Sequence, residues 1–280
     1  MINTEVISIE DAEATIFRSA PQWDGMTTMA LGDIKFSSLE GGKKLLQNFI
    51  ETAQKEGVGA VLGPLNGDTW HAYRLIFETD GSAPFLLEPT SGAHDLQAFE
   101  STGFESVSMY LSAKSSLNTT VSEKPVSMQG VTVEAWNGEN AEGLIQDLFN
   151  MSALAFQSNR FFTPITFESF LDIYQPMIPY LDKDHVLFAR DGEGDLQGFL
   201  FGMPNLLAGG DDRSVILKTY ASRMKGVGHL LADSYHRRCL DSGFETVIHA
   251  LIHEDNSSRK RSEMHGTRIF RRYALMGRKV

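Results

Sequence analysis

Two glycines flank one residue in the segment Arg223–Gly228 (Arg-Met-Lys-Gly-Val-Gly), which separates a predicted strand from the predicted first turn of a helix. Glycine lets a backbone approach a ligand closely, and the unbonded N–H groups at a helix start favour a phosphate group. Better-defined phosphate motifs are missing from the sequence. The dinucleotide fingerprint lacks its third glycine, because His229 follows Gly228, and no G-x-x-x-x-G-K-[ST] loop occurs. The segment is therefore either a phosphate-binding loop or an ordinary strand-to-helix turn.

Several histidines could take part in proton transfer or metal binding. His249 and His253 stand four apart in a predicted strand, where alternation places both on one face. No third ligand follows at a metal-ligand spacing, so we expect no metal. The two histidines are then either partly buried or solvent-facing, or one of them accepts a proton in the reaction. His236, on a predicted helix, is expected at the surface. Cys239 is the only cysteine, which excludes an intrachain disulfide and a thiolate metal cluster.

The charge of the chain limits its partners. A formal charge of −11 argues against nucleic-acid binding, which depends on clustered Lys and Arg over phosphates. Residues 259–280 depart from this balance, with eight basic residues and the single acidic Glu263, and such a block is either a solvated face or an anion site. No apolar run approaches the roughly 20 residues that span a bilayer, and the first residues lack a signal-peptide pattern. We therefore expect a soluble, cytoplasmic protein with no membrane partner.

The elements that must position these groups follow a mixed α/β pattern. With 42% hydrophobic and 22% charged residues the chain can bury a core, and 280 residues favour two units at about 150 each. Hydrophobic periodicity predicts the order β-α-α-β-β-β-α-β-α-β after residue 130. These elements are expected at 131–135, 140–156, 166–174, 185–190, 196–203, 214–220, 226–242, 244–252, 256–265 and 268–276.

An earlier stretch repeats the later part of this order. Leu45-Leu46 matches Leu230-Leu231 at an offset of 185, and Gly57 matches Gly243 at 186, which indicates an internal duplication. Its strands are expected at 26–36, 59–63 and 105–111, and its helices at 39–56 and 94–100. The polar run 113–127 is interpreted as a linker. The predicted domains are residues 1–115 and 128–280, with the linker at 116–127.

The element order, with R-x-x-G-x-G opening the helix after the third of three consecutive strands, resembles the GNAT superfamily of acyl-CoA-dependent N-acyltransferases over roughly residues 131–280. The terminal GTRIFRRYALMGR is similar to the closing strand of that family. The resemblance implies a mixed-sheet GNAT-like fold, with one complete C-terminal copy and a truncated N-terminal copy.

The resemblance also implies which residues bind acetyl-CoA or another acyl-CoA. In the family, the amides of the glycine loop hold the CoA pyrophosphate, the preceding strand binds the pantetheine arm and polarises the acyl carbonyl, and an asparagine opens the next helix. The basic block begins just after that asparagine, which favours its interpretation as an anion site. The residues so implied are Thr219, Tyr220, Ala221, Arg223, Met224, Lys225, Gly226, Val227, Gly228, His229, Asn256 and Arg259.

Direct acyl transfer to an amine needs a proton acceptor, polarisation of the thioester carbonyl, and an acid for the leaving thiolate. In the family this acid is often a tyrosine in the helix after the asparagine. The matching stretch here, residues 262–265, is Ser-Glu-Met-His, and the nearest tyrosine, Tyr273, falls in the last strand. Either Glu263 or His265 takes the role of acid, or solvent protonates the thiolate, or this copy is a poor catalyst.

The N-terminal copy departs further from the family pattern. Its loop at 38–44 has neither the arginine nor the G-x-G spacing, and Glu40 would repel a phosphate, so CoA should bind only the C-terminal half. The segment Gly63–Arg74 (GPLNGDTWHAYR) is either a turn with a capped helix or part of an acceptor pocket across the domain interface. Phe156, Phe161, Phe162, Phe167 and Phe170 form either core or, if partly exposed, an apolar acceptor pocket.

Together these features predict an N-acetyltransferase that moves an acetyl or other acyl group from acetyl-CoA to a primary amine of a small molecule or peptide. A non-catalytic acyl-CoA-binding or sensing protein is the alternative, because the tyrosine is missing, and a structural interaction module is a third. Loops rather than motifs shape acceptor pockets, so the sequence names neither the acceptor nor the oligomeric state.

Overall fold

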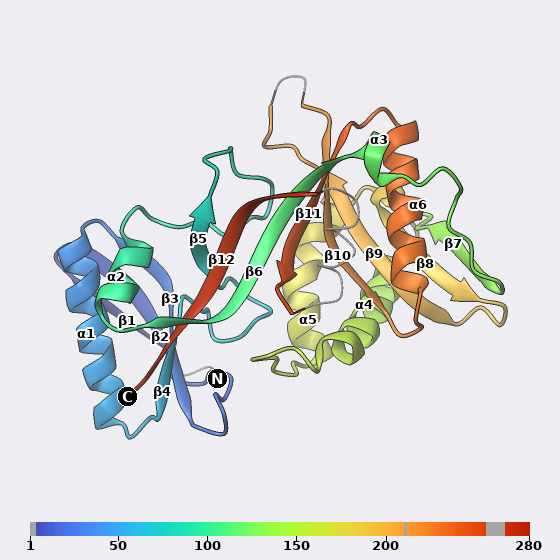
Figure 1. Ribbon diagram of the computed structural model, residues 1–280. Helices are drawn as coiled ribbons and strands as arrows, with labels where there is room; N and C mark the ends of the chain where they lie inside the picture. Colours follow the sequence, from blue (N-terminus) through green and yellow to red (C-terminus); the bar gives the residue numbers. More distant parts are fainter. Residues whose placement is uncertain (1–3, 210–211, 256–266) are drawn as a thin grey trace.

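The computed structural model describes residues 4–209, 212–255 and 267–280. In these ranges the strands form one mixed sheet of 12 strands, shown in Figure 1. The N-terminal half contains β1 (Thr4–Ile9), β2 (Ala12–Phe17), β3 (Thr28–Phe36), α1 (Leu39–Lys55), β4 (Ala60–Gly63), β5 (Leu75–Thr79), α2 (Asp95–Ser101), β6 (Glu105–Ser116) and α3 (Leu117–Thr120). The C-terminal half contains β7 (Val131–Ala135), α4 (Ala141–Phe156), α5 (Phe167–Tyr174), two 3₁₀ turns (Gln175–Tyr180 and Lys183–His185), β8 (Val186–Asp191), β9 (Leu196–Pro204), β10 (Ser214–Ser222), α6 (Val227–Asp241), β11 (Thr246–His253) and β12 (Arg268–Lys279).

Two long antiparallel strands, β6 and β12, occupy the centre of the sheet, whose order is β1-β2-β3-β4-β12-β6-β11-β10-β9-β8-β7, with β5 also pairing with β12. The strand β12 ends the C-terminal half but pairs with β4 of the N-terminal half. The strand β6 ends the sheet of the N-terminal half but pairs with β11 of the C-terminal half. Each half thus gives its last strand to the other, and Figure 1 shows both strands running between the two halves.

The predicted repeat is present in the structure. β3 and β10 begin at Thr28 and Ser214, and β4 and β11 begin at Ala60 and Thr246, the same spacing that separates Gly57 from Gly243. Both glycines follow a helix end with positive φ, +71° and +86°, a conformation that costs other residues more. The same bonds close both helix ends, from Val58 N to Ala53 O and from Phe244 N to Cys239 O.

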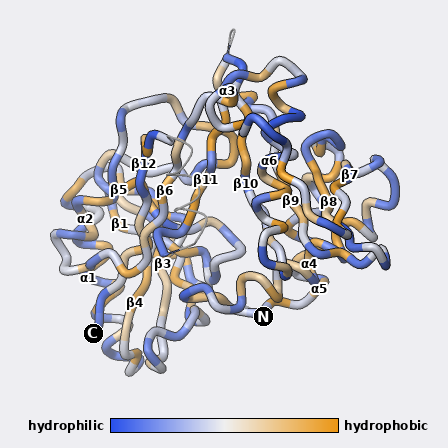
Figure 2. Tube along the Cα trace, turned by 45° about the vertical axis from the view of Figure 1, so that its right-hand side comes forward, coloured by the Kyte–Doolittle hydropathy of each residue, from blue (hydrophilic) through white to orange (hydrophobic). Residues whose placement is uncertain are grey.

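The two halves cover their sheets differently. In the C-terminal half, α6 packs on one face of the sheet and α4 on the other. Successive residues of a strand point to opposite faces, so in β8 Leu187 packs with α6 and Val186 packs with α4. Figure 2 shows hydrophobic residues gathered on these strands. In the N-terminal half, α1 and α2 cover one face, and the other is closed by Trp23 and by Phe161 from the C-terminal half. No counterpart of β7, α4 and α5 precedes β1 within the described ranges, as expected for a truncated copy.

The polar run expected as a linker is partly a central strand. Residues 113–116 extend β6, where Ala113 pairs with both His249 and Ile269, and α3 follows. One serine of that run, Ser115, is buried, and its hydroxyl lies 2.7 Å from that of Thr120. The sequence analysis also missed β1, β2, β5 and α3. In β1 the side chains are mostly exposed, so its hydrophobic pattern is weak.

None of the helices in the described ranges is long and apolar enough to cross a membrane.

The strand exchange predicts that neither half folds alone. A fragment of residues 128–280 would leave β11 and β12 without β6, and we expect it to lack a cooperative thermal transition by circular dichroism. Coexpression of residues 1–127 with residues 128–280 should restore a complex with a single transition. A 128–280 fragment that unfolds cooperatively by itself would contradict the dependence of each half on the exchanged strand.

Candidate functional site

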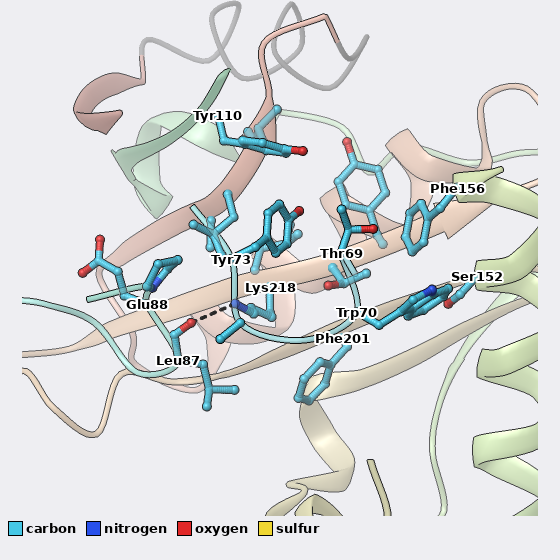
Figure 3. Close-up of a pocket in the computed structure, with 18 of the residues that line it drawn as sticks. Thr69, Trp70, Tyr73, Leu87, Glu88, Tyr110, Ser152, Phe156, Phe201 and Lys218 are labelled. Atoms are coloured by element: carbon cyan, nitrogen blue, oxygen red, sulfur yellow. Dashed lines mark hydrogen bonds between the residues drawn. The ribbon is translucent and has the colours of Figure 1, made fainter. Parts of the chain in front are cut away.

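A cavity of about 860 Å³ lies between the two halves. One wall consists of β10, β11 and the start of α6, and another of α4 and α5. The N-terminal half closes the remaining side with the loops at residues 64–74 and 87–92. Figure 3 shows Trp70, Tyr73 and Lys218 lining this space.

The cavity opens where two parallel strands separate. β10 and β11 pair only from Ser214 opposite Thr246 to Leu217 opposite His249. Beyond this point β10 has a bulge against β9, and β11 has one against β6, where Leu251 has φ +56°. Bulges bend strands and end pairing, so the two strands diverge and the edge of β10 faces the cavity. Of the predicted pantetheine-binding residues, Thr219 and Tyr220 line the cavity, whereas the Ala221 side chain is buried in the apolar cluster under α4.

The predicted phosphate loop ends at the start of α6. Gly226 precedes the first helical residue with φ +97°, and no side chain caps the helix. His229 lines the cavity, while Val227 and Gly228 are buried. Lys225 is exposed and Met224 packs against the core. The Arg223 side chain is already bound within the protein, because its Nε donates to Leu196 O at 2.7 Å. The loop therefore offers backbone N–H groups and the helix dipole rather than the Arg223 side chain.

The equivalent sites of the N-terminal half are filled. The Ser38 hydroxyl caps α1 by accepting from the Gly41 N–H, and Ser38 also bonds Asp11. In the loop after β4, the Asn66 side chain accepts from the Asp33 N–H of β3 at 3.0 Å. That only the C-terminal half binds CoA stays a prediction.

The segment Gly63–Arg74 contains no helix, so the interpretation as a capped helix is wrong. An isolated bridge between Leu65 and Tyr73 closes it into a loop. Eight of its twelve residues line the cavity between the halves, and a role in an acceptor pocket stays a prediction. The Asp68 carboxylate shapes the loop by accepting from the Trp70 N–H and by pairing with His71 at 2.8 Å, which raises the pKa of His71.

An aromatic cluster forms one wall of the cavity. The centre of the Trp70 ring lies 5.5 Å from that of Phe170, 5.7 Å from that of Phe162 and 6.5 Å from that of Phe156. The Trp70 Nε1 donates to Thr163 O at 2.8 Å. The phenylalanines divide between the two predicted roles. Phe161 is core, whereas Phe156, Phe162 and Phe170 line the cavity, and Phe167 packs on Phe149.

Lys218, at the bulge of β10, is a candidate functional residue that the sequence analysis missed. Its Nζ donates to Leu87 O at 3.0 Å inside the cavity, as Figure 3 shows. The pKa of Lys218 is lowered to about 7, chiefly by burial and also by the charge of Arg74, while the charge of Glu88 opposes the shift. A lysine inside the apolar run Ser-Val-Ile-Leu-Lys-Thr-Tyr was a signal that could have identified it.

The prediction that His249 and His253 share one face of the strand is wrong, because β11 has a bulge. The extra residue at Leu251 reverses the alternation, so His249 pairs opposite Ala113 and His253 opposite Tyr110, on different faces. The His253 Nε2 lies 3.1 Å from the Ser108 hydroxyl, and burial lowers the pKa of His253. His236 is buried at 3% exposure, not at the surface, and its Nε2 lies 3.1 Å from that of His249. In the described ranges no group of three His, Cys, Asp or Glu could hold a metal.

Four predicted site residues lie outside the described residues, so their roles stay predictions: Asn256, Arg259, Glu263 and His265. The arginines in the described part of the basic block are bound within the protein, so they do not form an open anion site. Arg271 pairs with Glu88, Arg272 with Glu254, and Arg268 with Asp80, while Arg278 donates to Thr102 O.

The mixed sheet, the diverging strand pair and the glycine-started helix define the fold of the GCN5-related N-acetyltransferases, with one complete and one truncated copy. The neighbouring solved structures include a GCN5-related N-acetyltransferase from Sphaerobacter thermophilus, with a TM-score of 0.56 and 14% identity over 96% of this chain and 76% of that one. A tandem GNAT protein from the clavulanic acid biosynthesis pathway has a TM-score of 0.57 and 11% identity, over 100% of this chain and 83% of that one. A probable N-acyltransferase from Enterococcus faecalis has a TM-score of 0.59 and 7% identity, over 96% of this chain and 59% of that one. No family model and no curated protein matches the sequence.

The environment of Lys218 predicts a lysine that titrates near neutral pH. In protein labelled with ¹³C- and ¹⁵N-lysine, one NMR resonance should titrate at about pH 7 and be absent from Lys218→Arg. Because the pKa in the unfolded chain is near 10.5, the unfolded state binds more protons between these values. Stability relative to Lys218→Met should therefore rise with pH from about 7 to 10.5. A spectrum in which every lysine titrates near 10.5 would show that the cavity does not bury this amine.

Proposed function

We propose that the protein is a CoA-dependent N-acyltransferase that acylates a primary amine in the cavity between the two halves. The observation that carries this proposal is the divergence of β10 and β11 beside the start of α6, where a glycine takes the N-cap position. It provides a free strand edge for an extended ligand and, next to it, a helix start for an anion. The neighbouring structures include an N-acetyltransferase and a probable N-acyltransferase, which supports the same reaction.

In this proposal the backbone amides at Gly226–His229 hold the CoA pyrophosphate. The edge of β10 at Thr219 and Tyr220 binds the pantetheine arm, and its N–H groups polarise the acyl carbonyl. Asn256 and Arg259 complete the proposed cofactor set. Acetyl-CoA is the proposed acyl donor, no metal takes part, and we place the reaction in the cytoplasm.

Lys218 is the proposed proton acceptor. With a pKa of about 7 it is partly neutral at physiological pH, and it lies next to the strand edge proposed for the thioester. The amine nitrogen forms its bond to the acyl carbon as the carbon–sulfur bond breaks, and the proton of the amine passes to the Lys218 Nζ. The departing thiolate takes up a proton from Lys218, from the predicted acids Glu263 or His265, or from solvent.

The pyrophosphate site is tested by a charge placed at the helix start. Any side chain at Gly226 costs about 1 kcal/mol in this left-handed conformation, so strain must be separated from charge. Asn tolerates this conformation and has nearly the shape of Asp. By isothermal titration calorimetry with CoA, Gly226→Asp should bind at least about tenfold more weakly than Gly226→Asn, a difference of about 1.4 kcal/mol. Equal affinity of the two variants would place the pyrophosphate elsewhere, and no binding by the wild type would refute the proposed function.

The role of Lys218 is tested by the pH dependence of the rate. With acetyl-CoA and a panel of primary amines, free-thiol release should give a kcat/KM that rises through about pH 7 and then levels off. Lys218→Met should lower the rate about 100-fold and abolish this rise. Lys55→Met, on the exposed face of α1, should leave both unchanged.

Two outcomes would contradict this role. If Lys218→Met keeps the pH dependence, another group accepts the proton. If mass spectrometry finds the acyl group on Lys218 itself, the lysine is a nucleophile. CoA binding without thiol release from any amine would favour the alternative of a non-catalytic acyl-CoA-binding protein.

A further inference from the structure

Arg74 is a buried arginine that lines the cavity at 9% exposure. Its guanidinium contacts two tyrosine rings, 3.9 Å from the centre of Tyr73 and 4.0 Å from that of Tyr110, and these rings are nearly perpendicular to each other, at 83°. Cation–π contacts hold a guanidinium without occupying all of its N–H donors. The side chain is therefore held in place while Nε and Nη1 stay without a partner among the described residues.

Two of those donors are unused. Within the described residues, Nε and Nη1 of Arg74 have no hydrogen-bond partner. A buried charge is normally paired, because taking an ion out of water costs several kcal/mol. The backbone of Arg74 is also in the left-handed region, at φ +70°, which is uncommon for a residue other than glycine. An arginine kept in this way is suited to a partner that the described residues do not supply.

The acidic residues that line the cavity do not serve as this partner. Glu88 accepts from Arg271, Tyr273 and the Phe85 N–H. The other three are held by different neighbours: Asp233 pairs with Arg237, Asp33 accepts from Asn66, and Asp95 accepts from the Gly92 N–H. Burial also raises the pKa of Asp95, which favours its neutral form.

Cationic groups, in contrast, face the same space. Lys218 and Arg160 line the cavity with Arg74, and the charge of Arg74 lowers the pKa of Lys218 and of His253. These cationic groups lie next to the aromatic wall of the cavity. A planar guanidinium fork with free donors matches a carboxylate, which can accept two parallel N–H bonds.

We infer that Arg74 is a carboxylate-binding site within the acyl-transfer cavity. The inference rests on the proposed function. Two sources could supply the carboxylate: an amine acceptor of the amino-acid type, or an acyl group that ends in a second carboxylate. In both cases the Trp70 cluster would pack against the apolar part of the ligand.

Binding can be measured without catalysis. The probe is 3-phenylpropionate, with its neutral amide, 3-phenylpropanamide, as the matched control. By calorimetry the acid should bind the wild type at least about tenfold more tightly than the amide, and Arg74→Met should lose this preference. Arg160→Gln is the control variant, because Arg160 lines the same cavity but donates to Val107 O, and it should keep the preference. Equal binding of acid and amide, or binding of neither, would overturn the inference.

Thermal stability separates a ligand site from a structural arginine. Replacing an unpaired buried charge with an apolar side chain should leave the melting temperature of Arg74→Met unchanged or raise it. A structural role predicts a lower melting temperature, and a loss of stability together with a loss of binding would overturn the inference.

Two substrate pairs then distinguish the sources of the carboxylate. The acceptor pair, with acetyl-CoA, is L-phenylalanine against 2-phenylethylamine; the donor pair is succinyl-CoA against butyryl-CoA. Arg74→Met should abolish the preference in one pair while binding of butyryl-CoA persists. A preference that survives Arg74→Met in both pairs would overturn the inference. If no acyl-CoA binds the wild type, the proposed function fails, and the 3-phenylpropionate titration still decides whether Arg74 binds a carboxylate.

Discussion

The antiparallel pairing of β6 with β12 is the interaction on which the rest of the molecule depends. It joins two sheets into one and places the closing strand of each half beside a strand of the other. The site follows from it, since Tyr110 on β6 contacts both Arg74 and His253, and Arg271 on β12 holds Glu88 beneath the cavity. A cavity between two halves is usually deformable, whereas here the same hydrogen-bond ladder connects its walls.

The two copies show how one scheme gives two outcomes. Both contain a short parallel strand pair whose two strands are connected by a helix with the same closing turn. In the N-terminal copy Ser38 caps the helix and the Asn66 side chain bonds the backbone of β3, so its own polar groups satisfy the backbone. In the C-terminal copy a glycine replaces the cap and two bulges separate the strands. The proposed ligand site is therefore in the copy whose strands separate.

The cavity also shows how a chain can keep reactive groups buried. Glu88 and Asp233 pair with arginines, whereas Asp33 and Asp95 accept hydrogen bonds from neutral groups. Two tyrosine rings contact Arg74. Among the described residues, Arg74 and Lys218 form no ion pair with an acid, at a cost in stability that binding of an anion would offset. This arrangement is expected where selection acts on ligand binding as well as on stability.

The sequence by itself determined the order of most strands and helices, the repeat, the glycine-started helix and the resemblance to the GNAT fold, because periodicity and glycine positions are local signals. Tertiary structure alone decided which strands pair, since the exchange of β6 and β12 joins residues more than 150 positions apart. It also decided that Ser115 is a buried hydrogen-bond partner in a strand and not part of a linker, and that His249 and His253 face opposite ways. A bulge depends on the neighbouring strand, so the local pattern could not reveal the one at Lys218. The sequence offered the segment of Arg74 as part of a pocket, but only the loops of one half meeting the strand edge of the other placed Arg74 and Lys218 in the same cavity.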